Sequence, residues 1–233
     1  MSKVIASRIE SVLPNIIHHN QTGYVKDRFI GETIRSIYDI MDYTVEENIT
    51  IKLTVTCDNT LFVASLTQLV SSRPRDSSET FLLCKHVKRA IRPNIPGLLI
   101  SIDFEKVFDS VEWDFLFKCP EAFNFGSDFL HWIKTSYKNV QSCTINNGTA
   151  SSYFPLERGV RQGDPLSPYL FIVVVETLAI AIRQNQRIRG ISIENEEPKI
   201  LQYADDITAV LSDVSSAEQL LELFYFFKGY FRS

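Results

Sequence analysis

The stretch Ile200–Leu211 reads ILQYADDITAVL and places two adjacent carboxylates between two apolar runs. Apolar, strand-like runs on both sides of a short polar segment predict a tight β-hairpin, with Ala204, Asp205 and Asp206 near its turn. Asp tolerates turns because its side chain can bond its own backbone, so an ordinary surface hairpin is the alternative. A second carboxylate-bearing segment is needed before the pair indicates chemistry.

Such a segment lies earlier in the chain. Residues 98–104 read LLISIDF, so Asp103 follows an apolar, strand-like run. If this strand lies beside the hairpin, Asp103 meets Asp205 and Asp206. Three carboxylates cannot stay close and ionised without cations, because like charges raise one another's pKa. Hard divalent ions such as Mg²⁺ resolve this conflict, and two of them would activate a 3′-hydroxyl and stabilise a leaving pyrophosphate. The carboxylates therefore predict nucleotidyl transfer.

Three motifs, in the same order along the chain, resemble those of reverse transcriptases. Residues 203–206, YADD, resemble the YxDD box, and residues 103–109, DFEKVFD, resemble the first catalytic-carboxylate motif. Residues 161–168, RQGDPLSP, resemble the motif between them. The chain is most similar to the non-LTR (LINE-type) retrotransposon branch, over residues 1–48 and 95–233.

The resemblance implies an α+β fold, a right-hand polymerase palm with an antiparallel sheet backed by helices, partial fingers and no thumb. It assigns residues 1–48 to the partial fingers and 94–233 to the palm, with a fingers hairpin near 140–156. Residues 49–93 match nothing in the family, and so long a loop inside a compact domain is uncommon. They are either a nucleic-acid-binding insertion or unselected, poorly ordered sequence, and the absence of a motif favours the second explanation.

The resemblance also assigns roles to single residues. Asp103, Asp205 and Asp206 match the catalytic and metal-binding positions, and Phe104 would offer its backbone carbonyl to a metal. Phe108 would clash with a ribose 2′-hydroxyl and so select deoxynucleotides, although a core aromatic residue is the alternative. The other candidates are the nucleotide-binding residues Gln162, Gly163, Arg28 and Lys26, and the primer or template contacts Tyr203, Pro165 and Ser167.

The implied function is that of an RNA-directed DNA polymerase, a nucleotidyltransferase. Its cofactor would be two Mg²⁺ ions, which Mn²⁺ could replace, and its partners would be an RNA template, a DNA primer and dNTPs. A catalytically inactive retrotransposon relic and a nucleic-acid-binding palm without chemistry are the alternatives. Because no thumb or primer grip is recognised in the sequence, we expect weak polymerase activity at best.

Composition sets limits on the other classes. The chain has 233 residues, is 45% hydrophobic and contains 16 Phe, enough to fill a core. Its net charge of −4 argues mildly against an extended basic face for nucleic acid, although a polymerase must hold acidic residues at its metal site. The cysteines form no C-x-x-C pair, which predicts reduced thiols and no structural zinc.

No signal peptide is expected from the polar residues near Met1. The longest apolar run, Tyr169–Ile182, has 14 residues and contains Glu176, too short and too polar to span a bilayer. We therefore expect an intracellular protein, in the nucleus or cytoplasm, with no membrane partner.

Periodicity predicts the remaining elements. We expect Pro14 and Pro120 to end or kink helices, Trp132 to face inward, and Ser215 or Ser216 to cap the last helix. Asn147-Gly148 should form a hairpin turn. The predicted helices are 4–13, 28–41, 111–118, 127–138, 169–183 and 217–228, and the predicted strands are 49–56, 140–146, 151–156 and 188–194.

Overall fold

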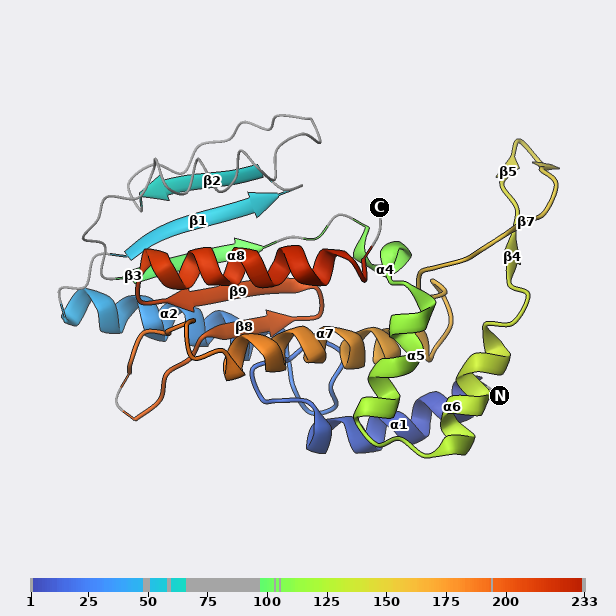
Figure 1. Cartoon of the computed structure of the whole chain (residues 1–233), viewed down its shortest axis with the longest axis horizontal. Coiled ribbons are helices and arrows are strands. Elements are labelled where there is room, and N and C mark those ends of the chain that lie inside the picture. Colours follow the sequence, from blue (N-terminus) through green and yellow to red (C-terminus); the bar gives the residue numbers. More distant parts are fainter. Residues whose placement is uncertain are drawn as a thin grey trace.

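A five-stranded sheet of order β2-β1-β3-β9-β8 forms the centre of the molecule (Figure 1). The computed structural model describes residues 2–47, 51–57, 60–65, 97–102, 104, 106–193 and 195–231. The elements are α1 (Ser2–Ile16), α2 (Ile30–Glu46), β1 (Ile51–Cys57), β2 (Thr60–Ser65), β3 (Gly97–Ile102), α4 (Val107–Ser110), α5 (Trp113–Ala122), α6 (Ser127–Ser136), β4 (Gln141–Ser142), β5 (Ile145–Asn146), β6 (Thr149–Ala150), β7 (Phe154–Pro155), α7 (Ser167–Gln184), β8 (Ile200–Tyr203), β9 (Asp206–Leu211) and α8 (Val214–Lys228).

Neighbouring strands of the sheet are antiparallel except for β1 and β3, which are parallel. Two further pairs, β4 with β7 and β5 with β6, are also antiparallel. This mixed helix and sheet architecture agrees with the predicted α+β class. The assignment of parts of the chain to fingers, and the absence of a thumb, stay predictions.

Helices cover both faces of the sheet. Directly paired residues share a face, because successive side chains of a strand alternate between faces. Ile100 and Ala209 are paired and belong to the larger core, which contains the buried side chains of α7 and α8. Leu99 and Val210 are paired on the other face and pack with Ile40 of α2. The sheet therefore lies between α7 with α8 on one side and α2 on the other.

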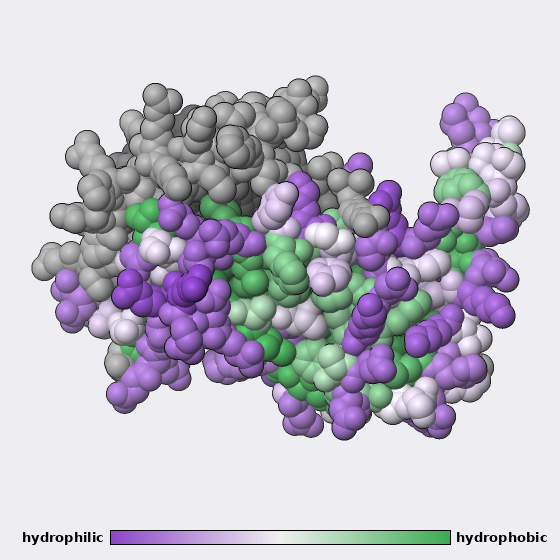
Figure 2. All heavy atoms as spheres, in the orientation of Figure 1, coloured by the Kyte–Doolittle hydropathy of each residue, from purple (hydrophilic) through white to green (hydrophobic). Residues whose placement is uncertain are grey.

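Helix α7 is the centre of the larger core. It has 18 residues, from Ser167 to Gln184, and is longer than the predicted apolar run. Among the described residues it is the one helix long and apolar enough to cross a membrane, with a mean hydropathy of 1.3. Of that helix 61% is buried inside the fold, which is the behaviour of a central core helix. The surface in Figure 2 is a mosaic of hydrophobic and hydrophilic residues over the viewed face.

Pro14 lies inside α1, so the prediction that the helix ends before it is wrong. A proline within a helix loses one backbone donor, and the end of any helix leaves carbonyls without partners. Here Arg28 donates to carbonyls at this end of α1, from Nη2 to Pro14 O at 3.1 Å and to Ile17 O at 3.0 Å. The helix therefore continues past Pro14, and a distant side chain satisfies its last carbonyls.

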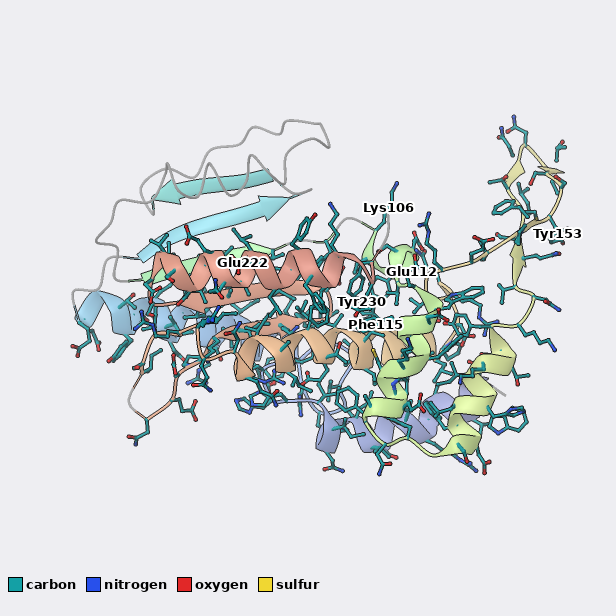
Figure 3. All side chains as sticks on the ribbon, in the orientation of Figure 1. Lys106, Glu112, Phe115, Tyr153, Glu222 and Tyr230 are labelled. Carbon is teal, nitrogen blue, oxygen red and sulfur yellow. The ribbon has the colours of Figure 1, made fainter. Side chains whose placement is uncertain are left out.

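The segment from β4 to β7 projects from the body as a long hairpin, with Tyr153 near its outer part (Figures 1 and 3). Its turn confirms the Asn147-Gly148 prediction, because both residues have positive φ, 49° and 78°. The two longer strands predicted here are wrong. They are replaced by the short pairs β4 with β7 and β5 with β6.

Four other local predictions are corrected by the structure. Pro120 is buried inside α5 and does not end it, since the helix continues to Ala122. Trp132 is 42% exposed and does not face the core. Residues 188–193 contain only an isolated bridge and no strand. The N-cap of α8 is Asp213, whose Oδ1 accepts a hydrogen bond from Ser216 N at 2.8 Å.

Part of the segment 49–93 belongs to the sheet. β1 pairs with the whole length of β3, from Ile51 opposite Gly97 to Thr56 opposite Ile102, and β2 pairs with β1. β1 falls close to the predicted strand, and the rest of the segment lies outside the described residues. Whether the segment is an insertion stays a prediction, but its strands cover an edge of β3 that would otherwise be open.

Candidate active site

The two adjacent carboxylates lie at the end of the β8–β9 hairpin. Tyr203 pairs with Asp206, so Ala204 and Asp205 form a two-residue turn, as the sequence predicts. Ala204 has a φ of 55°, a left-handed conformation that a residue with a Cβ rarely adopts. Asp206 is exposed and Asp205 is half-buried. The turn thus presents both carboxylates near the surface.

One face of the sheet becomes polar toward this turn. Along β9, Val210 is fully buried, Thr208 is half-buried and Asp206 is exposed, and alternation places all three on the same face. Ser101 of β3 pairs with Thr208 and is also half-buried. Helix α2 packs against the buried end of this face through Ile40, and the face becomes more exposed toward Asp206.

Asp103 itself lies outside the described residues, but the strand that precedes it is described. Ile102, the last residue of β3, pairs with Ile207, the residue after Asp206. This confirms that the two carboxylate-bearing segments are neighbours in the sheet. The meeting of Asp103 with Asp205 and Asp206 stays a prediction.

The two aromatic candidates pack on the protein's own rings. The Phe104 ring lies 5.8 Å from the Phe224 ring of α8, measured between centroids. The half-buried Phe108 ring stacks on Phe171 of α7, with centroids 4.1 Å apart and planes at 26°. Phe108 therefore packs against the core, as the alternative explanation requires. Its partial exposure is also compatible with the predicted contact to a nucleotide sugar.

The loop before α7 is tied to the segment after β3. Val160 N donates to Phe108 O at 2.7 Å, and the Gln162 amide donates to Asp109 Oδ1 at 2.9 Å. Gly159 has a φ of 82°, and a Cβ there would lie 2.9 Å from the backbone of Asp109, so glycine is required. Hence two of the three motifs are in direct contact.

The other candidates from this loop differ in accessibility. Gly163, with a φ of 86°, and Pro165 are exposed, whereas Ser167 is 4% exposed at the start of α7. Arg161 pairs with Asp164 at 2.6 Å, which fixes the loop between them. Because Ser167 is buried, it offers little surface to a primer or template, and its predicted contact with them stays a prediction.

The remaining candidates, Lys26, Arg28 and Tyr203, differ in exposure and in the contacts that they already make. Lys26 is exposed, and Tyr203 is half-buried beside Asp206. Arg28 already donates to four backbone carbonyls, those of His18 and Gln21 at 2.7 and 2.8 Å and those of Pro14 and Ile17. Its contact with a nucleotide stays a prediction, and in the structure its guanidinium binds the backbone of residues 14–21.

A buried ion pair, Glu176 with Arg183, lies beneath the N-terminal segment. Glu176 is 2% exposed, and burial raises its pKa, which the guanidinium opposes. Nearby, burial and the charge of Arg183 lower the pKa of His18 to about 4. The sequence signal for this cluster was an acidic residue inside an apolar helix, with a basic residue seven positions later.

Gln21, which is 1% exposed, is a further residue of this region and was not predicted from the sequence. Its side-chain carboxamide bonds the backbone of Ala204 at the turn between β8 and β9. The only signal was its place in the Gln-Thr-Gly-Tyr segment, 183 positions before Ala204. Such a distant contact cannot be read from local sequence.

Comparison with known proteins gives consistent results. The family model described as "Reverse transcriptase (RNA-dependent DNA polymerase)" matches residues 1–228. The Transposon TX1 uncharacterized 149 kDa protein of Xenopus laevis is 24% identical over 224 residues, 95% of this chain and 14% of that protein. A retrovirus-related Pol polyprotein from the R2 retrotransposable element of Nasonia vitripennis is 33% identical over 132 residues, 56% of this chain and 12% of that protein.

An uncharacterized mitochondrial protein of Arabidopsis thaliana is 41% identical over 86 residues, 35% of this chain and 70% of that protein. The chain thus spans only a small part of the two retrotransposon proteins. The family match covers nearly the whole chain and includes all three sequence motifs. It agrees with a sheet in which the Asp-Asp hairpin lies beside β3, the strand that ends directly before Asp103 in the sequence. The chain therefore belongs to the reverse transcriptase family, in its non-LTR retrotransposon branch.

Proposed function

We propose that this chain is the catalytic palm of an RNA-directed DNA polymerase, which extends a DNA primer with dNTPs along an RNA template. The observation that carries the proposal is the register of β3 on β9, with Ile102 opposite Ile207. Asp103 follows Ile102 in the sequence, and we propose that it continues the alternation of β3 and so shares the face of Ser101 and Asp206. The three carboxylates would then converge at one end of the sheet.

The donor set suits a hard divalent ion. Carboxylate oxygens are the ligands that Mg²⁺ prefers, and Mg²⁺ sites use few protein carboxylates together with substrate phosphates. Among the described residues, no group of three His, Cys, Asp or Glu side chains could hold a metal. Asp205 and Asp206 supply two ligands, and we propose Asp103 as the third and the Phe104 carbonyl as a further one. Two bound ions would supply charge neutralisation, activation of the primer 3′-hydroxyl and stabilisation of the leaving pyrophosphate.

The residues around the carboxylates would position the substrates. The exposed Gln162, held by Asp109, and the exposed Gly163 would lie against the incoming nucleotide. Phe108, fixed by its stack on Phe171, would exclude a 2′-hydroxyl. Tyr203, paired with Asp206, would support the primer end by packing. We further propose an intracellular site of action, in the nucleus or cytoplasm, where template and dNTPs are present.

Primer extension tests this function. The 233-residue chain is incubated with an RNA template, a DNA primer, dNTPs and Mg²⁺, beside Asp205→Ala and the control Asp39→Ala. Asp39 is a surface carboxylate of α2 whose side chain is 69% exposed and pairs loosely with Arg35 at 3.9 Å. Extension that is lost in Asp205→Ala and kept in Asp39→Ala supports the proposal.

No extension by a wild-type chain that is folded, as judged by a cooperative unfolding transition, refutes the catalytic proposal for this chain. Measurement of template–primer binding in the same preparation then separates the two alternatives. Retained binding indicates a nucleic-acid-binding palm without chemistry, and lost binding indicates an inactive relic.

A further inference from the structure

The Gln21 side chain holds the backbone of the turn that carries the carboxylates. Its Nε2 donates to Ala204 O at 3.0 Å, and its Oε1 accepts from Ala204 N at 2.8 Å. The same Oε1 accepts from Gly23 N at 2.8 Å. The carboxamide thus satisfies both polar groups of Ala204, in a site from which water is excluded because Gln21 is 1% exposed.

This side chain continues a short strand pairing along the outer edge of β8. Thr22 N donates to Gln202 O at 3.0 Å, and Gln202 N donates to Asn20 O at 2.8 Å. The backbone pairing between the two segments is the single bridge from Gln21 to Gln202. At Ala204, the next residue on the same edge, the Gln21 carboxamide donates and accepts as a peptide group would. The ladder is thereby extended to the residue directly before Asp205.

The close approach depends on Gly23. A Cβ on Gly23 would lie 2.2 Å from Ala204 N and 2.9 Å from its Cα, so only glycine leaves room for the turn. Ala204 in turn has a φ of 55°. A residue with a side chain keeps such a backbone conformation only where its surroundings enforce it. The Gln21 carboxamide and the Gly23 backbone are the surroundings that do so here.

We propose that Gln21 is a positioning residue, which fixes the Ala204 backbone so that Asp205 and Asp206 are held in the geometry of a divalent-metal site. The inference rests on the proposed function, in which these two carboxylates bind the divalent ions. Gln21 binds both backbone polar groups of Ala204. It acts through Ala204, which is covalently joined to Asp205.

The kinetic test uses Gln21→Met, which keeps the length of the side chain and removes all three hydrogen bonds. The control is Thr33→Val, which removes a buried hydroxyl at the same junction. That hydroxyl contacts Thr22 Oγ1 at 2.6 Å and Gln202 O at 3.4 Å, and leaves the Ala204 contacts intact. Rates are corrected for the folded fraction of each protein.

For Gln21→Met we expect kcat to fall about 10- to 100-fold, as for a misplaced catalytic group, with a smaller change in the KM for dNTP. The Mg²⁺ concentration that gives half-maximal rate should rise several-fold. Thr33→Val should lower the unfolding temperature and leave the Mg²⁺ dependence as in the wild type. An unchanged Mg²⁺ dependence in Gln21→Met, or an equal shift in both variants, overturns the proposal.

Amide hydrogen exchange gives a readout that does not need activity. In Gln21→Met, exchange at Ala204 N and Gly23 N should be faster, while exchange at Val210 N, inside β9, stays as in the wild type. Unchanged exchange at Ala204 overturns the positioning role, whatever the enzyme does. If the wild-type chain is inactive but Ala204 loses protection in the variant, the proposed function fails while the contact that underlies the inference is upheld.

Discussion

The strongest structural prediction concerns Gly23→Ala. The added Cβ would be placed 2.2 Å from Ala204 N, and the group it meets is backbone, which no side-chain rotation can move away. Either the segment 20–24 or the β8–β9 turn must shift, and both are joined by the hydrogen bonds of Gln21 and Thr22. The substitution should therefore weaken the junction between the N-terminal segment and the carboxylate hairpin.

The size of the effect follows from two opposing contributions. Overpacking of a filled site costs about 1–3 kcal/mol, and a clash with backbone belongs near the top of this range. Replacing Gly by Ala restricts the unfolded chain and returns about 0.4–1 kcal/mol. The net loss in the free energy of unfolding should be about 2 kcal/mol, which corresponds to a fall of roughly 4–8 °C in the unfolding temperature of a domain of this size.

Urea unfolding followed by circular dichroism measures this loss. The matched control is Gly229→Ala at the end of α8, where φ and ψ are −61° and −21° and the nearest atom to a new Cβ is 3.5 Å away. That variant should be as stable as the wild type or slightly more stable, since Ala fits the helical conformation. If Gly23→Ala is as stable as Gly229→Ala, the close approach of Gly23 to Ala204 is refuted.

Three further predictions follow from single contacts. Arg28→Lys should lower the free energy of unfolding by about 2–4 kcal/mol in a urea titration, because Lys cannot donate to four carbonyls. The control Arg35→Lys, at an exposed residue, should change the free energy of unfolding by less than about 0.5 kcal/mol. Normal stability of Arg28→Lys together with a raised KM for dNTP would instead show that Arg28 binds the nucleotide. His18 has a pKa lowered by burial and by Arg183 to about 4, so the native state binds fewer protons than the unfolded state between that value and about 6.5. The wild type should therefore lose stability as pH falls from about 6.5 toward 4, and His18→Gln should show a shallower loss; parallel stability curves for the two proteins would contradict this. Phe108→Val should increase incorporation of ribonucleotides relative to deoxynucleotides about 10-fold or more in primer extension. An unchanged ratio would show that Phe108 does not select the sugar and serves to pack on Phe171.

The candidate catalytic residues could be predicted from the sequence, but the contacts that hold their backbone could not. The turn at Ala204 and Asp205 and the neighbourhood of the strand before Asp103 were predictable, because two apolar runs that end in carboxylates have few ways to pair. The motif order then supplied the family. The contacts that fix the turn were not predictable, since the Gln21 carboxamide reaches a residue 183 positions away and no periodicity records such a contact.

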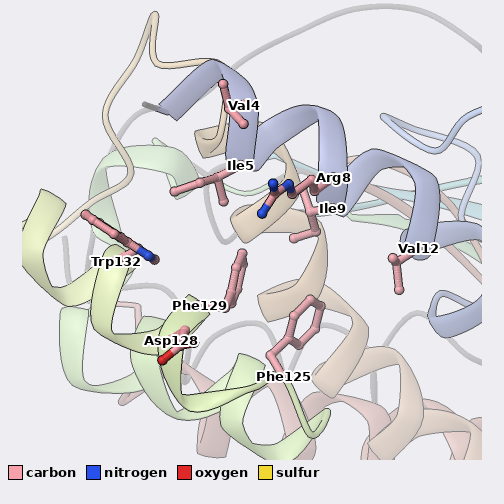
Figure 4. Close-up of a pocket in the computed structure, with 9 residues that line it drawn as sticks. All are labelled: Val4, Ile5, Arg8, Ile9, Val12, Phe125, Asp128, Phe129 and Trp132. Atoms are coloured by element: carbon pink, nitrogen blue, oxygen red, sulfur yellow. The ribbon is translucent and has the colours of Figure 1, made fainter.

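Several local errors share one physical cause, which is that tertiary contacts outweigh local propensity. Pro14 predicted a helix end, but Arg28 satisfies the carbonyls that the last turn of α1 leaves open. Trp132 matched an inward-facing spacing, yet it lies at the rim of an apolar groove of about 520 Å³ between α1 and α6 (Figure 4). Arg8 and Asp128, both exposed, also line this groove beside its apolar residues.

The division into fingers and palm, which the sequence suggested, does not correspond to separate cores. Ala6, Ile9 and Leu13 of α1 belong to the same buried cluster as α7 and the sheet. Residues 20–22 complete the open edge of β8, and α2 covers the face of the sheet opposite α7. An edge strand with free backbone groups is a point of weakness in any sheet. Because the turn at Ala204 and Asp205 lies at the end of that edge strand, residues 20–22 contact both the strand and the turn. The geometry of the carboxylates and the stability of the sheet are therefore coupled, and a change at Gln21 or Gly23 should affect both.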